Sequence, residues 1–310
     1  DIEASKEIIE TFINETQKNK DRITTAYSQK NVNEIYKALL EYKKQNSDYI
    51  ILGYSDDHIG YVLERAKINY VHTYHGNWPD ARWINAEFFL KSFYFIPMYK
   101  KTITNASYVI NVSEYMNNYT RKFNEKSKVI RNGIDEKSSD GYKINEKSFI
   151  MVGNIDARKY RKAIQLSEEI YKMDSSINID IYGEIIQTSI ANKLKKQKNI
   201  VLKGKSNQIY YNHYMGLINT STIENLSISV CEALKSNLPV FCFEVGGLPE
   251  VVQNDNTGYC CSSKDFKILA KKLVQYANGK YKLDMKTDFI KEFNWNYASE
   301  EYIKVFNKLS

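Results

Sequence analysis

The sequence predicts an α/β protein with two parallel β-sheets, one in each of two domains. Short apolar runs, typical of buried strands, alternate with helical segments in two successive blocks. A polar stretch over residues 135–148 separates the blocks and is typical of a linker or long loop. The 310 residues suffice for two domains of ordinary size. Ligands of such folds bind beyond the carboxyl ends of the strands.

The first block alternates helices and strands. Ser113 is the expected N-cap of one helix, and Pro97 is expected to break a long aromatic-rich helical segment. In order, the expected elements are a helix over 4–17, a helix over 32–45, a strand over 48–55, a helix over 58–68, a strand over 69–76, a helical segment over 83–106, a strand and helix over 107–123, and a closing segment over 128–135.

The second block repeats the alternation. Asn237 is the expected C-cap of a helix that begins near Leu226, because Pro239 forbids its continuation. In order, the expected elements are a strand over 148–155, a helix over 160–173, a strand over 177–183, a helix over 187–197, a strand over 199–204, a helix over 207–215, a strand over 216–221, a helix over 226–236, a strand over 239–245, and late helices over 266–277 and 297–309.

The composition is typical of a globular protein with a modest positive charge. The formal net charge is a modest +7. Nucleic-acid-binding proteins usually concentrate their positive charge more strongly, so we expect no nucleic-acid partner. Mild basicity fits an anionic small-molecule substrate or loose contact with an anionic membrane surface. No apolar run reaches the roughly 18 residues that span a bilayer. The four cysteines lack zinc-type spacing, and we expect buried free thiols in a cytoplasmic protein.

Two glutamates eight residues apart, Glu224 and Glu232, raise the question of a catalytic pair. In the expected helix, Glu224 precedes the first turn and Glu232 lies two turns inside. At about 1.5 Å per residue they are roughly 10 Å apart along the axis, too far for the roughly 5 Å pair of a retaining glycosidase. The backbone N–H groups of residues 225–227 could instead hold an anion or hydroxyl groups. Spacing alone favours a simpler alternative, two solvated carboxylates.

The segment "IENLSISVCEALKSNLPVFCFEVGGLPEVVQNDNTGYC" resembles the donor-site segment of the family 4 retaining glycosyltransferases, which carries an E-x7-E motif. Other segments resemble that family in the same order along residues 48–310: "NYVHTYHG", "SYVINVSEYM", "KVIRNGID", "FIMVGNIDARKYRKAIQL", "NIVLKGKSNQIYYNHYM" and "FNWNYASEEYIKVF". Agreement over so many ordered segments is hard to obtain by chance.

This resemblance implies the GT-B fold, in which two Rossmann-like domains with parallel sheets face a central cleft. We therefore expect an acceptor-side domain over residues 1–145, a nucleotide-sugar-binding domain over 146–294, and a C-terminal helix over 295–310 that returns to the first domain. The family's usual first strand and glycine-rich loop have no counterpart in residues 1–47. Because the chain starts at Asp1, we expect that part to be absent from it.

The resemblance also implies transfer of a sugar from a nucleotide diphosphate, UDP above all, with retention of configuration and without a metal ion. The expected catalytic residues are Glu224 on the sugar hydroxyls, Lys159 on the diphosphate, and His75 on the sugar from the first domain. A cation at Lys159 suits the departing diphosphate, on which negative charge grows. Glu232 is expected to hold the ribose. The other expected donor-binding residues are Gly153, Asn154, Arg158, Lys205, Asn225, Leu226 and Ser227.

This sequence departs from the family pattern inside the site. Asn154 stands where the family has an arginine, so one diphosphate cation is missing unless Arg158 or Arg161 supplies it. Tyr160 replaces a glycine after Lys159. The loop "NLS" over residues 225–227 replaces "GFG", and its leucine is where we expect donor preference to be set.

Several other residues allow more than one interpretation. Asp56, Asp57 and His58 follow an expected strand and could contact an acceptor, bind a metal or form a plain polar loop. His72 is expected to be structural. The aromatic and lysine residues over 83–101 could form a membrane-surface edge, although a core helix with solvated lysines explains them as well.

We expect a cytoplasmic bacterial glycosyltransferase, peripheral at the inner membrane face. Its partners would be a nucleotide sugar and a cell-surface glycan, lipid-linked or protein-linked acceptor. Two alternatives remain: a non-catalytic GT-B partner of another transferase, and a GT-B nucleotide-sugar epimerase.

Overall fold

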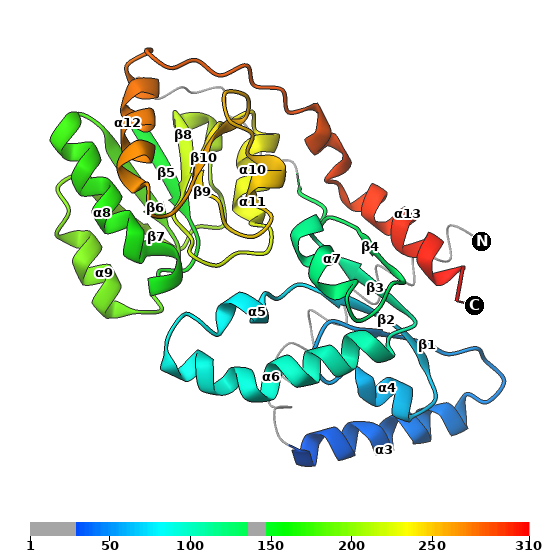
Figure 1. The fold of residues 1–310 in the computed structure, drawn as a ribbon. Helices are drawn as coiled ribbons and strands as arrows, with labels where there is room; N and C mark the ends of the chain where they lie inside the picture. The colour runs from blue at the N-terminus through cyan, green and yellow to red at the C-terminus, as the bar shows by residue number, and fades with distance from the viewer. Residues whose placement is uncertain (1–28, 136–146, 310) are drawn as a thin grey trace. The chain divides into compact units, whose positions relative to one another are not determined.

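The computed structural model describes residues 29–135 and 147–309, which form two compact units (Figure 1). Unit 1 takes in the chain up to Arg131 together with Trp295 onward, and unit 2 spans Asn132–Asn294. Unit 2 thus begins before the polar linker, whereas the sequence places the boundary at 145. The reason is local: Ile134 donates its N–H to the carbonyl of Phe293 at 2.9 Å and accepts from Lys235 Nζ at 2.5 Å.

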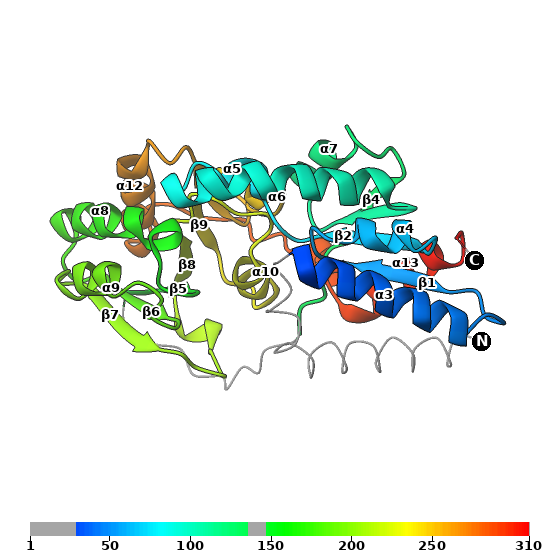
Figure 2. The same ribbon diagram turned by 90° about the horizontal axis from the view of Figure 1, so that it is seen from below.

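Unit 1 contains a four-stranded parallel sheet in the order β1-β2-β3-β4. Helices cover both faces (Figure 2). The elements are α3 (Gln29–Gln45), β1 (Leu52–Ser55), α4 (Tyr61–Arg65), β2 (Asn69–Tyr74), α5 (Trp78–Ala81), α6 (Ala86–Asn105), β3 (Tyr108–Asn111), α7 (Glu114–Thr120), β4 (Ser127–Val129) and α13 (Trp295–Phe306).

Alternation along the strands divides the core of unit 1 in two. Tyr70 and Val109 point to one face, where Ile103 of α6 packs on them. Val71 and Ile110 point to the other, where α13 packs. The C-terminal helix is therefore part of the first unit, although the whole of unit 2, Asn132–Asn294, lies between it and β4 in the sequence.

Unit 2 contains a six-stranded parallel sheet in the order β10-β9-β8-β5-β6-β7. The elements are β5 (Ser148–Val152), α8 (Ala157–Met173), β6 (Asn178–Tyr182), α9 (Thr188–Lys195), β7 (Ile200–Gly204), the 3₁₀ turn η1 (Tyr211–His213), β8 (Gly216–Asn219), α10 (Ile228–Lys235), β9 (Val240–Phe243), α11 (Leu248–Val251), β10 (Gly258–Cys261), α12 (Phe266–Ala277) and the 3₁₀ turn η2 (Asp288–Glu292).

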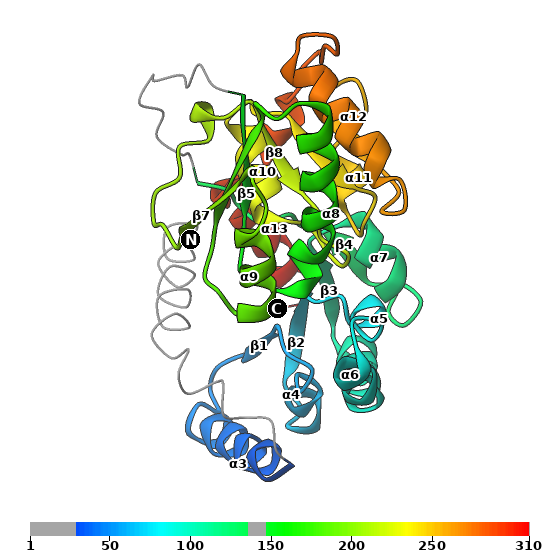
Figure 3. The ribbon, with the colours of Figure 1, turned by 90° about the vertical axis from the view of Figure 1, so that its left-hand side faces the viewer.

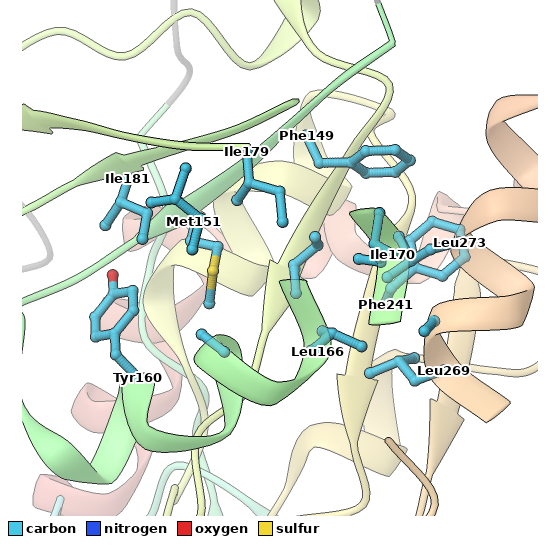
Figure 4. Packing of buried hydrophobic residues seen from close by; sticks show 14 of the residues in the cluster. Phe149, Met151, Tyr160, Leu166, Ile170, Ile179, Ile181, Phe241, Leu269 and Leu273 are labelled. Atoms are coloured by element: carbon cyan, nitrogen blue, oxygen red, sulfur yellow. The ribbon is translucent and has the colours of Figure 1, made fainter. Parts of the chain in front are cut away.

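The sheet of unit 2 is buried on both faces, as an all-parallel sheet requires. Helices α8, α9 and α12 cover one face, and α10 and α11 cover the other (Figures 1 and 3). Figure 4 shows side chains of β5, β6 and β9 meeting those of α8 and α12. All four cysteines are buried free thiols of this unit: Cys231, Cys242, Cys260 and Cys261.

Most expected elements are present, and two expected helical segments differ from the prediction. Helix α6 runs unbroken through Pro97, which lies on its exposed side, where water can bond the carbonyl that loses its partner. The helix expected over 207–215 is only η1, because Ser206 forms a local turn with Gln208 instead. The helix expected over 4–17 falls outside the described residues.

Candidate active site

The carboxyl ends of β5, β8 and β9 meet the first turns of α8 and α10 in unit 2. Two contacts hold this region together. Thr222, after β8, donates its N–H to the carbonyl of Arg158 at 2.9 Å. Ser229 Oγ of α10 lies 3.4 Å from the carbonyl oxygen of Val152. This is the edge of a parallel sheet where ligands bind.

Lys159 lies over the end of β5. Its Nζ is 2.7 Å from the position that a Cβ atom on Gly153 would occupy, and Gly153 has φ +141°, a conformation that favours glycine. Lys159 also lines a small cavity of about 10 Å³, with Asn219 and Thr220 of the β8 end. That volume fits about one water molecule. The backbone conformation thus favours glycine here, and the Lys159 ammonium group occupies the space that a Cβ atom would take.

Asp156 starts α8 and orients its first turn. Its carboxylate caps the helix by accepting the N–H groups of Arg158 and Lys159 at 2.8 and 3.1 Å. The same carboxylate binds the Arg158 guanidinium, with Nη2 to Oδ2 at 2.7 Å. Arg158 is therefore partly neutralised by its own helix cap. Asn154, at the expected arginine position, is exposed.

The loop that carries Glu224 packs against the turn after β9. Gly247 donates its N–H to the carbonyl of Asn225 at 2.6 Å. A Cβ atom on Gly246 would lie 1.9 Å from the carbonyl oxygen of Glu224, and Gly246 has φ +57°. The turn therefore requires glycine for two reasons, the backbone conformation and the close approach of the Glu224 loop.

Helix α10 begins two residues later than expected, at Ile228, with Ser227 as its N-cap. Glu232 consequently lies little more than one turn inside the helix rather than two. Of the loop side chains, Asn225 and Ser227 are buried, while Glu224 and Leu226 are half-buried. The helix ends one residue earlier than predicted, at Lys235 with Ser236 as its C-cap, and the predicted cap Asn237 follows at φ +55°.

Glu232 is held by a residue that the sequence analysis missed. The phenol of Tyr211, in η1, donates to Glu232 Oε2 at 2.6 Å. Tyr211 is buried, and its pKa lies well above the usual value because of burial and the neighbouring carboxylate. It is therefore a neutral donor that fixes the orientation of the glutamate. No sequence signal identified Tyr211 as a partner of Glu232, because the pattern over residues 207–215 predicts only an ordinary helix.

Lys205 lies apart from this group. It follows β7, the edge strand, and its Nζ is 3.9 Å from Glu184 Oε2 on the exposed surface. The segment leading into the Glu224 loop thus contacts the first turn of α8, which carries Lys159, whereas Lys205 lies at the margin of the sheet.

His75 lies in unit 1, at the carboxyl end of β2, and is exposed. Loss of solvation around its ring lowers its pKa, and the charge of Asp56 partly opposes that shift. His72 on the same strand is fully buried, 3.4 Å from Ser55 Oγ, and burial lowers its pKa to about 3. His72 is thus a neutral core residue, in agreement with its predicted structural role.

The chain matches two protein families. The family described as Glycosyl transferases group 1 matches residues 135–292, just over half of the chain. Glycosyltransferase Family 4 matches residues 25–138. A curated relative, the poly(ribitol-phosphate) alpha-N-acetylglucosaminyltransferase of Staphylococcus aureus, is 23% identical over 156 residues, which are 46% of this chain and 32% of the relative. The chain thus spans about a third of that relative's length.

Solved structures share the fold. Sucrose-phosphate synthase from Thermosynechococcus elongatus is 17% identical, with a TM-score of 0.76 over 90% of this chain and 78% of its own. A variant of S. aureus TarM, in complex with Fondaparinux, alpha-GlcNAc-glycerol and UDP, is 18% identical, with a TM-score of 0.65 over 87% of this chain and 58% of its own. Both the family matches and the two parallel sheets lead to one conclusion. The chain belongs to the group 1 glycosyl transferases and has the GT-B type of fold.

Proposed function

We propose that the protein transfers a sugar from UDP to a cell-surface glycan, lipid-linked or protein-linked acceptor, with retention of configuration. The observation that carries this proposal is that the segment leading into the Glu224 loop contacts the first turn of α8, which carries Lys159, at the carboxyl edge of the sheet of unit 2. Family membership supports glycosyl transfer. The presence of UDP in the similar TarM complex supports the choice of nucleotide.

The proposed chemistry follows from the charges at that edge. When the bond between the sugar carbon and the diphosphate oxygen breaks, negative charge grows on the diphosphate, and the ammonium group of Lys159 stabilises it. The N-terminal ends of α8 and α10 add partial positive charge from their aligned peptide groups. We propose that these groups suffice and that transfer needs no metal ion.

The other residues have proposed binding roles. Glu224 accepts hydrogen bonds from hydroxyls of the transferred sugar, and the adjacent Leu226 limits which sugar fits. Glu232, oriented by Tyr211, accepts the ribose hydroxyls. The acceptor hydroxyl bonds to the sugar carbon from the side that the diphosphate leaves, and its proton goes to the diphosphate oxygen. His75 remains a proposed contact of the transferred sugar.

We also propose a peripheral location at the inner membrane face. Among the described residues no helix is long and apolar enough to cross a bilayer. Helix α6 nevertheless exposes apolar side chains, with Leu90 and Phe93 each 69% exposed. Lys91 lies between them in the sequence, a pattern suited to an anionic lipid surface. Flotation of the protein with anionic vesicles, and its loss in Phe93→Glu, would test this location.

The function is tested with a panel of nucleotide sugars, measuring both hydrolysis and transfer. Lys159→Ala and Glu224→Gln should each lower kcat by about 10²-fold, the usual effect of losing one group that stabilises developing charge or holds the reacting sugar. Lys172→Ala is the control, because Lys172 is an exposed residue in the last turn of the same helix α8. Unchanged turnover in both site variants would refute the proposal. Donor binding without any turnover would favour the non-catalytic partner instead.

A further inference from the structure

Unit 1 contains a cavity of about 370 Å³ that is separate from the proposed donor site of unit 2. It opens where β1 ends, and its side chains come from the loop after β1, from α5 and from α6. Its volume lies in the usual range for small-molecule sites. The lining residues are Asp56, Asp57, His58, Trp78, Phe88, Lys91, Phe95 and Tyr99.

One wall of the cavity is aromatic and held in place. The ring of Trp78 stacks on Phe95 with centroids 4.5 Å apart and planes 16° apart, and on Phe88 at 5.7 Å. The short helix α5 that carries Trp78 is fixed by its cap, since the Asn77 side chain accepts the backbone N–H of Asp80 at 3.3 Å and donates to Asp80 Oδ2 at 2.9 Å. A preformed aromatic wall of this kind suits a ligand with an apolar face.

The cavity also carries carboxylates. Asp57 Oδ1 accepts the backbone N–H of His58 at 2.5 Å and also bonds its ring Nδ1. Burial alone would raise the pKa of Asp57, but these bonds and the His58 charge outweigh it, so the pKa lies below the usual value. His58 is buried, and its carbonyl accepts from Thr102 at 2.6 Å. The cavity thus presents fixed hydrogen-bond acceptors, which match hydroxyl donors.

The charges of the cavity disfavour an anion. Asp56 and Asp57 are two carboxylates, and Lys91 is the one ammonium among the lining residues. Lys91 is itself bonded to Glu87 at 2.6 Å on the surface of α6. With His58 counted as charged, the lining residues Asp56, Asp57, His58 and Lys91 sum to zero, and Glu87, bonded to Lys91, brings the total to −1. A phosphate group in this cavity would be repelled, whereas a neutral polyhydroxylated ring would not.

We propose that this cavity binds a neutral sugar ring of the acceptor and rejects a polyol phosphate. A pyranose has an apolar C–H face for the aromatic wall and hydroxyl donors for the carboxylates. Asp56 follows β1 and His75 follows β2, and these strands are neighbours in the sheet, so the cavity lies at the same sheet edge as the residue assigned to the transferred sugar. This inference rests on the proposed function, because it names the acceptor class of the same enzyme.

The experiment titrates the full chain, saturated with UDP, against two kinds of probe by saturation-transfer NMR. The probes are methyl glycosides of neutral hexoses and N-acetylhexosamines, and ribitol 5-phosphate. We expect at least one glycoside to bind and the phosphate not to bind. Trp78→Ala should weaken glycoside binding about threefold to tenfold, the worth of one aromatic contact. Trp83→Ala is the control, because Trp83 is 67% exposed and outside the cavity lining.

A second variant changes only charge. Asp56→Lys, at an exposed position, should weaken glycoside binding and allow ribitol 5-phosphate to bind. Preferred binding of the phosphate by the unmodified protein, or equal glycoside binding in Trp78→Ala, would overturn the inference. Failure of UDP itself to bind would instead count against the proposed function. The two failures are thereby separate, and thermal melts of each variant establish that it is folded.

Discussion

Replacing Gly246 by alanine should inactivate the proposed donor site, although Gly246 is not one of the residues proposed to contact the donor. The added Cβ would lie 1.9 Å from the carbonyl oxygen and 2.7 Å from the carbonyl carbon of Glu224. Because contacts under 3.0 Å essentially do not occur for real Cβ atoms, the two segments must separate by about 1 Å. The backbone at φ +57° adds about 1–2 kcal/mol of strain for any residue with a Cβ atom.

We expect turnover to fall further than the loss of unfolding free energy alone would cause. A displacement of about 1 Å in a substrate-positioning loop can cost about 10²-fold in rate. Gly279→Ala is the matched control, since Gly279 has φ +69° and no atom within 4 Å of an added Cβ. It should lose about 1–2 kcal/mol of unfolding free energy and keep its turnover.

The assay combines chemical denaturation with rates of UDP-sugar hydrolysis and transfer for both variants. If Gly246→Ala turned over donor as fast as Gly279→Ala, the contact between the turn and the Glu224 loop would not position the donor.

Three further predictions concern single residues. Tyr211→Phe removes a hydrogen bond to a charged group, so the Kd for UDP, measured by calorimetry, should rise about tenfold with little change in kcat; an unchanged Kd would show that Glu232 needs no support. Asp156→Ala removes the cap of α8 and should cost about 1 kcal/mol in denaturation experiments, and equal stability would contradict the capping role. For His72 the folded pKa, about 3, lies below the usual 6.5, so the unfolded state takes up a proton first as pH falls. The contribution of His72 to the free energy of unfolding should be complete above pH 6.5 and decline below it, by about 2 kcal/mol at pH 5. In His72→Gln, denaturation curves recorded above pH 6.5 and at pH 5 should lack this decline.

The sequence by itself determined the two α/β blocks and most of their strands. Apolar runs bounded by polar turns specify buried parallel strands, because period and burial are properties of neighbouring residues. Local chemistry also specified the cap at Ser113, whose Oγ accepts the N–H of Met116 at 3.2 Å, and the helix end before Pro239. Resemblance to known motifs then identified the family.

Only the tertiary structure decided which side chains support one another. The bond from Tyr211 to Glu232 joins residues 21 apart through the packing of η1 on α10, and the contact of Gly246 with Glu224 joins two loops. The cavity beside Trp78 likewise needs α5, α6 and the β1 loop together. Such contacts depend on sheet order and helix packing, which no local period encodes, so the supporting residues of this site could not be predicted from the sequence.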